Sequence, residues 1–432
     1  MITTHQNGTT ITVMLAARAI NPLSRLFQRE LAALIDKLEA RRPRLSGVIV
    51  GFHAEAGDSD HELEHLMALT RAQAGDCMQM LGAYNALLRR LENLGIPVIA
   101  TLSGAVSGHA LGLVLACHRR ICLAEARFSL PQVRLGLMPA AGEVARTVRL
   151  TGLQAAMPLL LEGATLSAVQ ALQAGLIHGV ADNEEQLAAR VGAEMGATAV
   201  QPWEARGFRL PGGELSSAPL QALLQVAPAM LRAGTHGHAP APEAILCAMV
   251  EGLQVDFDSA LLIESRYFCQ TAISPVARNL MRLSQIRADI GTPAALAFAA
   301  ALHAALAREV AALREEGVPE ALLRNAARAA GLPPPTPLAP QRRRDDAPPR
   351  PAFDDIRDRL LYAPAVAALH AVALGTAPTS RDEADLISVL ACGFPAHTGG
   401  AIRFVQHTGK DTFAGRAAAF GPRFALPLGW DA

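Results

Sequence analysis

GIPVIATLSGAVSGHALGLVLACHRRICLAEARFSLPQVRLGLMPAAGEVARTVRLTG, residues 95–152, is the stretch that decides the fold. Its apolar run at residues 97–102 predicts a buried strand, and residues 110–117 predict an apolar helix. Gly104 and Gly108 lie between them and suit a tight turn, because glycine adopts backbone conformations closed to other residues. The stretch is apolar enough to imitate a membrane span. Its serines, its histidine and the turn at its start favour a strand, a turn and a buried helix instead.

The sequence on both sides of this stretch alternates between strands and helices up to about residue 182. Further strands are predicted at residues 11–15, 48–52 and 121–124. Apolar residues at three- and four-residue steps predict amphipathic helices at residues 23–38 and 81–91. Such alternation is typical of an α/β domain with a largely parallel sheet covered by helices.

The rest of the chain is predicted to be helical. A loop at residues 207–217 precedes helices at 242–253 and 259–271, and an Ala-rich helical region starts near residue 291. Proline density then predicts an extended linker at residues 333–352. The predicted segments are an N-terminal domain at residues 1–200, packing helices at 201–290, a helical segment at 291–332, this linker, and a second helical segment at 353–432.

Composition narrows the class of protein. Lys and Arg total 39 and so do Asp and Glu, which argues against broad nucleic-acid binding, because that requires a basic surface. The six cysteines form no C-x-x-C pair, so we expect reduced thiols and no structural zinc site. Residues 1–10 are polar without a basic region, which predicts a cytoplasmic protein with no secretory signal and no membrane span.

Several motifs of the stretch resemble the crotonase (enoyl-CoA hydratase/isomerase) superfamily. Residues 97–112 resemble its PVIAAINGxAxGGGxE pattern, residues 120–122 its R-x-A strand, and residues 128–139 its F-x-x-PE-x-x-x-G-x-x-P segment. The later helices resemble the multifunctional fatty-acid oxidation α subunit, at residues 241–281, 313–337 and 356–426. The resemblance implies a crotonase-type spiral of ββα repeats followed by an all-α C-terminal half.

The resemblance also implies where a thioester would bind. Backbone N–H groups of Gly57, in the turn at residues 56–58, and of His109 would form an oxyanion hole for the thioester oxygen. The two catalytic glutamates of the family match Gly112 and Gln132. An amide does not exchange protons near neutral pH and glycine supplies no group, so we expect an impaired or inactive hydratase.

Two other residues could supply the catalytic group that the missing glutamates would have provided. Glu143 stands where the family usually has glycine, so it is a possible substitute base in the acyl pocket, alongside Gln132 and Gly112. The preferred interpretation is an exposed carboxylate at a helix N-terminus, where the helix dipole favours negative charge. His109 matches a family glycine, and its imidazole could act as a base or simply pack at the helix start.

A separate segment matches the zinc-binding motif H-E-x-x-H. It reads His61-Glu62-Leu63-Glu64-His65. On a helix, His61 and His65 would share a face and could bind zinc, with Glu62 as the base. The motif is short and no third ligand follows at a known spacing. We therefore interpret the segment as a charged surface and predict no metal.

The expected function is acyl-CoA binding of the fatty-acid β-oxidation type. The α subunit that the chain resembles carries an NAD-binding domain, but here Ile290 leads directly into helical sequence with no G-x-G-x-x-G motif, so we expect no NAD and no other cofactor. A thiolase-type β subunit or a second copy of the chain is the expected partner. The alternatives are an isomerase or thioester hydrolase that uses Glu143 or His109, a structural assembly subunit without CoA binding, and a zinc hydrolase.

Overall fold

The chain forms two compact units in the computed structural model. The structure describes residues 2–53, 60–337, 350–378 and 380–430, without the side chains of residues 60–62. Unit 1 contains Met1–Arg232 and Pro240–Ala277, and unit 2 contains Ala233–Ala239 and Arg278–Ala432. The predicted helical segments at 291–332 and 353–432 thus lie in one unit, whose boundary comes earlier than the predicted residue 291.

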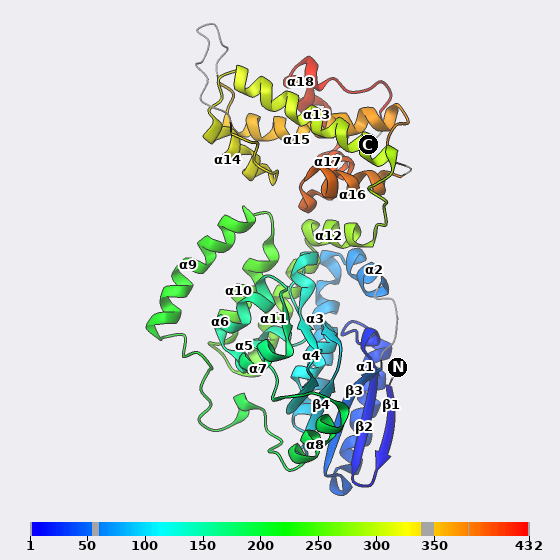
Figure 1. Cartoon of the computed structure of the whole chain (residues 1–432), viewed down its shortest axis with the longest axis vertical. Coiled ribbons are helices and arrows are strands. Elements are labelled where there is room, and N and C mark those ends of the chain that lie inside the picture. Colours follow the sequence, from blue (N-terminus) through cyan, green and yellow to red (C-terminus); the bar gives the residue numbers. More distant parts are fainter. Residues whose placement is uncertain (1, 54–59, 338–349, 379, 431–432) are drawn as a thin grey trace. The chain divides into compact units, whose positions relative to one another are not determined.

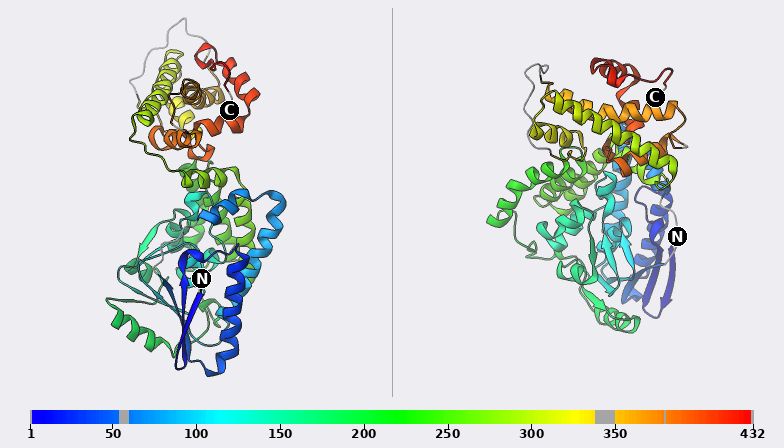
Figure 2. Two further views of the ribbon diagram at one scale, coloured as in Figure 1. Left: turned by 90° about the vertical axis from the view of Figure 1, so that its right-hand side faces the viewer. Right: turned by 45° about the horizontal axis from the view of Figure 1, so that its top comes forward.

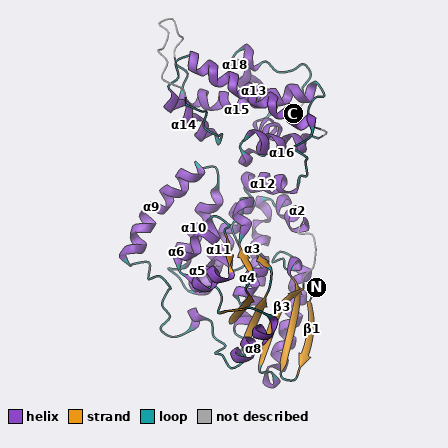
Figure 3. Ribbon diagram, in the orientation of Figure 1, coloured by secondary structure: helices purple, strands orange, loops and turns teal. Residues whose placement is uncertain are grey.

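Unit 1 is built on a six-stranded sheet of order β1-β2-β3-β4-β6-β9 (Figures 1 and 3). Only β1 pairs antiparallel with its neighbour, and the other pairs are parallel, as predicted. A second sheet has the order β5-β7-β8. The strands are β1 (Ile2–Asn7), β2 (Thr10–Ala16), β3 (Gly47–His53), β4 (Val98–Leu102), β5 (Ala105–Ser107), β6 (Arg119–Leu123), β7 (Arg127–Ser129), β8 (Thr165–Ser167) and β9 (Gly179–Ala181).

Helices cover this sheet. The apolar face of α8 buries Leu187 and Val191 against Ile99 and Ile121 of the sheet, while α1 packs on α3 through Phe27 and Tyr84. The helices of unit 1 are α1 (Arg25–Arg41), α2 (Asp60–Ala68), α3 (Ala74–Glu92), α4 (His109–Leu115), α5 (Glu143–Thr151), α6 (Leu153–Leu161), α7 (Ala168–Gln173), α8 (Glu184–Glu194), α9 (Ala218–Thr235, entering unit 2 at its end), α10 (Pro240–Gly252) and α11 (Phe257–Ala272).

The quoted stretch folds as a strand, a turn and a buried helix. β4 lies inside the sheet, and Gly104 and Gly108 have φ angles of 62° and 56°, where residues with side chains are strained. The following helix, α4, is buried from Ala110 to its end. The stretch is therefore part of a folded core, and the prediction of a strand, a turn and a buried helix at this place is confirmed.

The described residues of unit 2 form helices and no strand (Figure 2). Its central helices, α13 and α15, bury Phe298, Leu302 and Leu369 in one core, and Leu313, Leu323 and Leu360 form a second. The helices are α13 (Pro293–Glu315), α14 (Glu320–Ala330), α15 (Phe353–Ala373), α16 (Arg381–Cys392), α17 (Ala401–Thr408) and α18 (Lys410–Ala419), preceded by α12 (Pro275–Gln285), which spans the boundary of the units.

One helix in the described part of the chain is long and apolar enough to cross a membrane by length and composition alone. This helix is α13. Phe298 and Leu302 on α13 are 1% and 0% exposed and pack in the helical core. A buried core helix of a folded unit meets the same criterion of length and hydropathy. Helix α13 is therefore weak evidence for a membrane-spanning helix.

His118 makes the stability of unit 1 dependent on pH. Its Nδ1 accepts a hydrogen bond from the Val98 backbone N–H (3.0 Å), and its Nε2 donates to the Glu92 carbonyl (2.9 Å), so the ring must be neutral. Burial lowers the pKa of His118 below 6.5. The unfolded chain therefore binds more protons, and the stabilisation, complete above pH 6.5, is lost as the pH falls toward the lowered pKa.

We expect this loss to reach about 1.4 kcal/mol per pH unit, measured by urea unfolding at several values between about pH 7.5 and about pH 5. Because other groups also titrate, the informative quantity is the difference in slope between the wild type and His118→Gln, which should have a shallower slope. His5→Gln, on the exposed β1, is the control and should keep the wild-type slope. Equal slopes in all three proteins would contradict the prediction.

Candidate functional site

Glu143 is the first residue of α5 and is fully buried. The turn before it contains Ala141 and Gly142, both with positive φ angles (61° and 84°). This turn directs the Glu143 side chain inward, where it is 0% exposed. The preferred interpretation from sequence, an exposed carboxylate at a helix N-terminus, is therefore wrong. The helix start was predicted, but the direction of the side chain depends on the turn geometry.

The Glu143 carboxylate binds two other predicted site residues, one on each oxygen. His109 Nδ1 lies 2.6 Å from Oε1, and Gln132 Nε2 donates to Oε2 at 2.7 Å. His109 begins α4, and Gln132 lies in the short 3-10 helix Pro131–Leu135. Three residues far apart in the sequence thus form one polar cluster, which we call the Glu143 cluster.

Gly112 borders the cluster because it has no side chain. A Cβ atom at this position would lie 2.7 Å from Cγ and 2.8 Å from Oε1 of Glu143. The carboxyl group of Glu143 therefore occupies space next to the α4 backbone that any side chain at position 112 would need. The positions that match the family's two glutamates are thus filled by one carboxylate from a third position and by an amide.

Replacing Gly112 with alanine tests this geometry. Gly112→Ala should displace Glu143, break its bond to His109, and destabilise unit 1 by about 1–3 kcal/mol through overpacking. The matched control is Gly82→Ala, in the middle of α3, where an added Cβ meets no atom within 4 Å. That variant should be neutral or more stable by up to about 1 kcal/mol. Urea unfolding of both proteins checks the prediction, and equal effects would contradict it.

Helix α11 holds the turn that carries Glu143. The Glu264 carboxyl group of α11 accepts hydrogen bonds from the backbone N–H groups of Gly142 (2.6 Å) and Ala145 (2.9 Å). Burial, with a smaller contribution from the nearby charge of Glu143, raises the pKa of Glu264 to about 8. Residues well outside the crotonase-like stretch therefore help to position the cluster.

A buried ion pair supports the same turn from the other side. Arg146 Nε donates to Glu92 Oε1 at 2.7 Å, and both side chains are at most 1% exposed. Arg146 Nη1 also donates to the carbonyl of Ala141 at 3.1 Å. A Cβ on Gly142 would lie 1.7 Å from Arg146 Nη1, so only glycine fits beside this guanidinium. Arg146, Glu92 and Glu264 were not predicted from the sequence, because nothing in a helical pattern marks a charged residue as buried.

The cluster contains one acceptor that no described residue satisfies. Gln132 Oε1 is buried and receives no hydrogen bond in the described part of the chain. Its amide orientation is fixed, since Nε2 must face the carboxylate of Glu143. The His109 side chain is 13% exposed, whereas that of Glu143 is 0% exposed.

Other predicted site residues are not placed. Gly57 and the turn at residues 56–58 lie outside the described residues. The backbone of α2 includes the H-E-x-x-H motif and His65 is exposed, but the side chains of His61 and Glu62 are not described. Among the described residues, no group of three or more His, Cys, Asp or Glu could hold a metal ion. The predicted absence of zinc stays a prediction.

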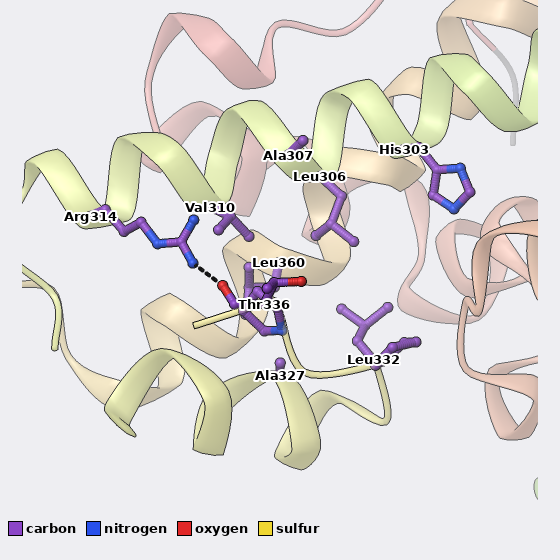
Figure 4. Close-up of a pocket in the computed structure, with 11 residues that line it drawn as sticks. His303, Leu306, Ala307, Val310, Arg314, Ala327, Leu332, Thr336 and Leu360 are labelled. Carbon is purple, nitrogen blue, oxygen red and sulfur yellow. Dashed lines mark hydrogen bonds between the residues drawn. The ribbon is translucent and has the colours of Figure 1, made fainter. Parts of the chain in front are cut away.

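Unit 2 has a separate cavity of about 320 Å³ between α13, α14 and the chain that follows α14 (Figure 4). Its lining is mainly apolar, for example Leu306, Val310 and Leu360, with His303 toward one end and Arg314 at the other. Arg314 is engaged with Glu320 (2.6 Å) and with the Thr336 carbonyl (2.7 Å). No predicted site residue lines this cavity.

The fold and the position of the cluster define a class of protein. A largely parallel sheet and a second small sheet carry polar groups at the start of α4 and in the segment after β7, in an α/β fold of the crotonase type. Residues 5–196 match the sequence model described as "Enoyl-CoA hydratase/isomerase", so this part of the chain is similar to that family. The fold predicted from sequence, with an all-helical C-terminal half, is confirmed.

Several solved structures are similar to part of this chain. An enoyl-CoA hydratase/isomerase from Marinobacter aquaeolei is 21% identical, with a TM-score of 0.40, covering 55% of this chain and 91% of that one. An enoyl-CoA hydratase from Bacillus halodurans is 19% identical, with a TM-score of 0.38, covering 63% and 98%. An enoyl-CoA hydratase/carnithine racemase from Magnetospirillum magneticum is 25% identical, with a TM-score of 0.39, covering 45% and 72%. The similarity to the family depends on the sequence model and not on these scores.

Proposed function

We propose that unit 1 binds acyl-CoA thioesters of the fatty-acid β-oxidation type and is not an efficient enoyl-CoA hydratase. One observation carries this proposal: the Glu143 carboxyl group fills the space beside Gly112 and is held by the amide of Gln132. Where the family pattern has two glutamates, the cluster has one carboxylate and one amide. Water addition to a double bond needs a base for the water and an acid for the carbon, and each positioned group contributes about 10²–10⁴-fold.

The expected thioester contacts are backbone amides. His109 and Gly57 would donate their N–H groups to the thioester oxygen, as the family resemblance implies. Such donors do not depend on the side chain, so binding is compatible with the loss of both glutamates. The acyl chain would lie next to Gln132, Glu143 and Gly112.

Two variants at one position test the backbone contact. His109→Ala keeps the N–H group, whereas His109→Pro removes it at the first helical position, where proline is tolerated. With a non-hydrolysable acyl-CoA thioether, His109→Ala should bind like the wild type and His109→Pro about fivefold more weakly, since a hydrogen bond contributes about 1 kcal/mol. Titration calorimetry measures both affinities, and free coenzyme A controls for contacts of the nucleotide.

Saturating thioether should also stabilise the wild type, by about 2.7 kcal/mol at 100 times its dissociation constant. No stabilisation and no heat of binding would overturn the proposal and favour a structural assembly subunit. Equal affinities of His109→Ala and His109→Pro, with both proteins folded, would place the thioester oxygen elsewhere.

A second candidate function is that of an active enzyme with altered chemistry. It would be an isomerase or a thioester hydrolase that uses Glu143 or His109. The hydrogen-bonded contact between these two side chains favours it, because a carboxylate beside an imidazole is a base-orienting arrangement. The family resemblance further supports a thiolase-type β subunit or a second copy of the chain as partner, a cytoplasmic location, and no NAD.

A further inference from the structure

Helices α3 and α11 pack against each other in unit 1. Near the end of α3, Arg89 Nε lies 2.9 Å from Asp258 Oδ1, and the guanidinium lies 4.9 Å from the ring centre of Phe257, at the start of α11. Cys77 lies 12 residues before Arg89, and Cys269 lies 11 residues after Asp258. At about 1.5 Å per residue, these spacings span about 18 Å and about 16.5 Å, so two antiparallel helices bring Cys77 and Cys269 to the same level.

The two thiols meet at this level. Both cysteines are free and buried, with only 3% and 4% of the residue exposed. A side-chain hydrogen bond joins Cys269 to Cys77. Each cysteine belongs to the buried face of its helix, one turn before Leu81 on α3 and one turn after Ser265 on α11. The packing of the two helices therefore holds the pair of thiols together.

The hydrogen bond makes the two thiols chemically unequal. It lowers the pKa of the Cys77 thiol, although burial acts in the opposite direction. The same bond, together with burial, raises the pKa of Cys269. Because the thiolate is the form that reacts with an oxidant, Cys77 is the nucleophile of the pair. Cys269 keeps its proton and is placed to attack the oxidised sulfur of Cys77 in a second step.

We propose that Cys77 and Cys269 form a reversible oxidation site, which reacts with hydroperoxides and closes a disulfide between α3 and α11. The Cys77 thiolate attacks an oxygen of hydrogen peroxide, the O–O bond breaks, and Cys77 becomes a sulfenic acid. Hydroxide leaves and takes up the proton that Cys77 lost on ionising. The Cys269 sulfur then attacks the Cys77 sulfur, and the hydroxyl group leaves with the Cys269 proton as water. Two thiols are oxidised to one disulfide, and the peroxide is reduced to two molecules of water.

The disulfide would join positions 192 residues apart in the chain. A cross-link removes conformational freedom from the unfolded chain, and a long loop loses more than a short one. The oxidised protein should therefore unfold at a urea concentration about 1 M higher than the reduced protein. Helix α11 also carries Glu264, which caps the turn before Glu143, so oxidation fastens the helix that supports this turn. The inference does not depend on acyl-CoA binding.

The test is treatment of the full-length chain with hydrogen peroxide, followed by alkylation of the remaining thiols and peptide mapping by mass spectrometry without a reductant. The expected product is a pair of peptides joined through Cys77 and Cys269, and dithiothreitol should restore both thiols. Cys269→Ala should stop the reaction at the sulfenic acid of Cys77, which dimedone traps. Cys77→Ala should give no dimedone adduct at Cys269, because its raised pKa keeps it protonated.

Two other cysteines serve as controls. Cys117 is also buried, but burial raises its pKa to about 12, so it should stay a free thiol. Cys247→Ala removes an exposed cysteine and should leave the cross-link unchanged. In concentrated urea the pairing of Cys77 with Cys269 should lose its preference over other pairs. A folded wild type that keeps both thiols in excess peroxide, or that links either one to Cys247, would overturn the inference, and so would equal yields in the folded and unfolded chains.

Discussion

Arg146→Met is expected to destabilise unit 1 by about 3–5 kcal/mol, because it leaves the buried carboxylate of Glu92 without its closest cation. Arg146 is 0% exposed, and its guanidinium also bonds the Ala141 carbonyl and lies 5.4 Å from the ring centre of Phe257. Glu92 retains Arg89 at 2.8 Å, but this second cation lies toward the surface, with 19% of its side chain exposed. Urea unfolding measures the loss.

Arg266→Met is the matched control for this prediction. Arg266 also pairs with a glutamate, Glu251, at 2.9 Å, but the two side chains are 60% and 40% exposed. An exposed pair contributes at most about 1 kcal/mol, so this variant should be nearly neutral. A second check is the double variant Arg146→Met with Glu92→Met, whose cost should be less than the sum of the single costs. Similar losses in Arg146→Met and Arg266→Met would mean that burial is not what makes the pair important.

Restoring the family pattern is expected to create hydratase activity. A variant that combines His109→Gly, Gly112→Glu, Gln132→Glu and Glu143→Gly would supply both carboxylates and vacate the space they need. Hydration of crotonyl-CoA should rise by about 10²–10⁴-fold over the wild type, which is the contribution of a positioned acid or base. Absorbance of the conjugated thioester measures the rate.

The expected gain in hydration rate depends on which substitutions are combined. Gly112→Glu alone should give no gain, because a Cβ at that position already lies 2.7 Å from Glu143 Cγ. The variant with the other three substitutions and glycine kept at position 112 is the control for the second carboxylate, and it should stay well below the full combination. A folded, thioether-binding protein that shows no gain with all four substitutions would mean that Gly112 and Gln132 do not face the reacting carbons.

Sequence alone predicts the framework of unit 1 because the deciding signals are local. The runs that become β2, β3 and β4 are mainly apolar, as is typical of buried parallel strands. The strand β1 was not predicted, since residues 2–7 are mostly polar and lie on the exposed edge of the sheet, where pairing with β2 and not burial determines the structure. The short strands β5, β7 and β8 are too brief to show a pattern.

The sequence predicts which residues form the site, but it does not predict how their side chains are arranged. Gly112, Gln132, His109 and Glu143 were all identified from the sequence, but their arrangement depends on contacts that no local pattern contains. Glu143 turns inward because of the positive φ angles before it and because Glu264, 121 residues later, caps the same turn. Long-range hydrogen bonds of this kind become visible only in the folded chain.

The rate at which the wild-type protein hydrates crotonyl-CoA tests the central claim most directly. With Glu143 held between His109 and Gln132, and no second carboxylate at the cluster in the described residues, the rate should be at least about 10²-fold below that of the four-substitution variant. A wild-type rate equal to or above that of the variant would contradict the account, because the purified protein would then hydrate efficiently without the paired glutamates.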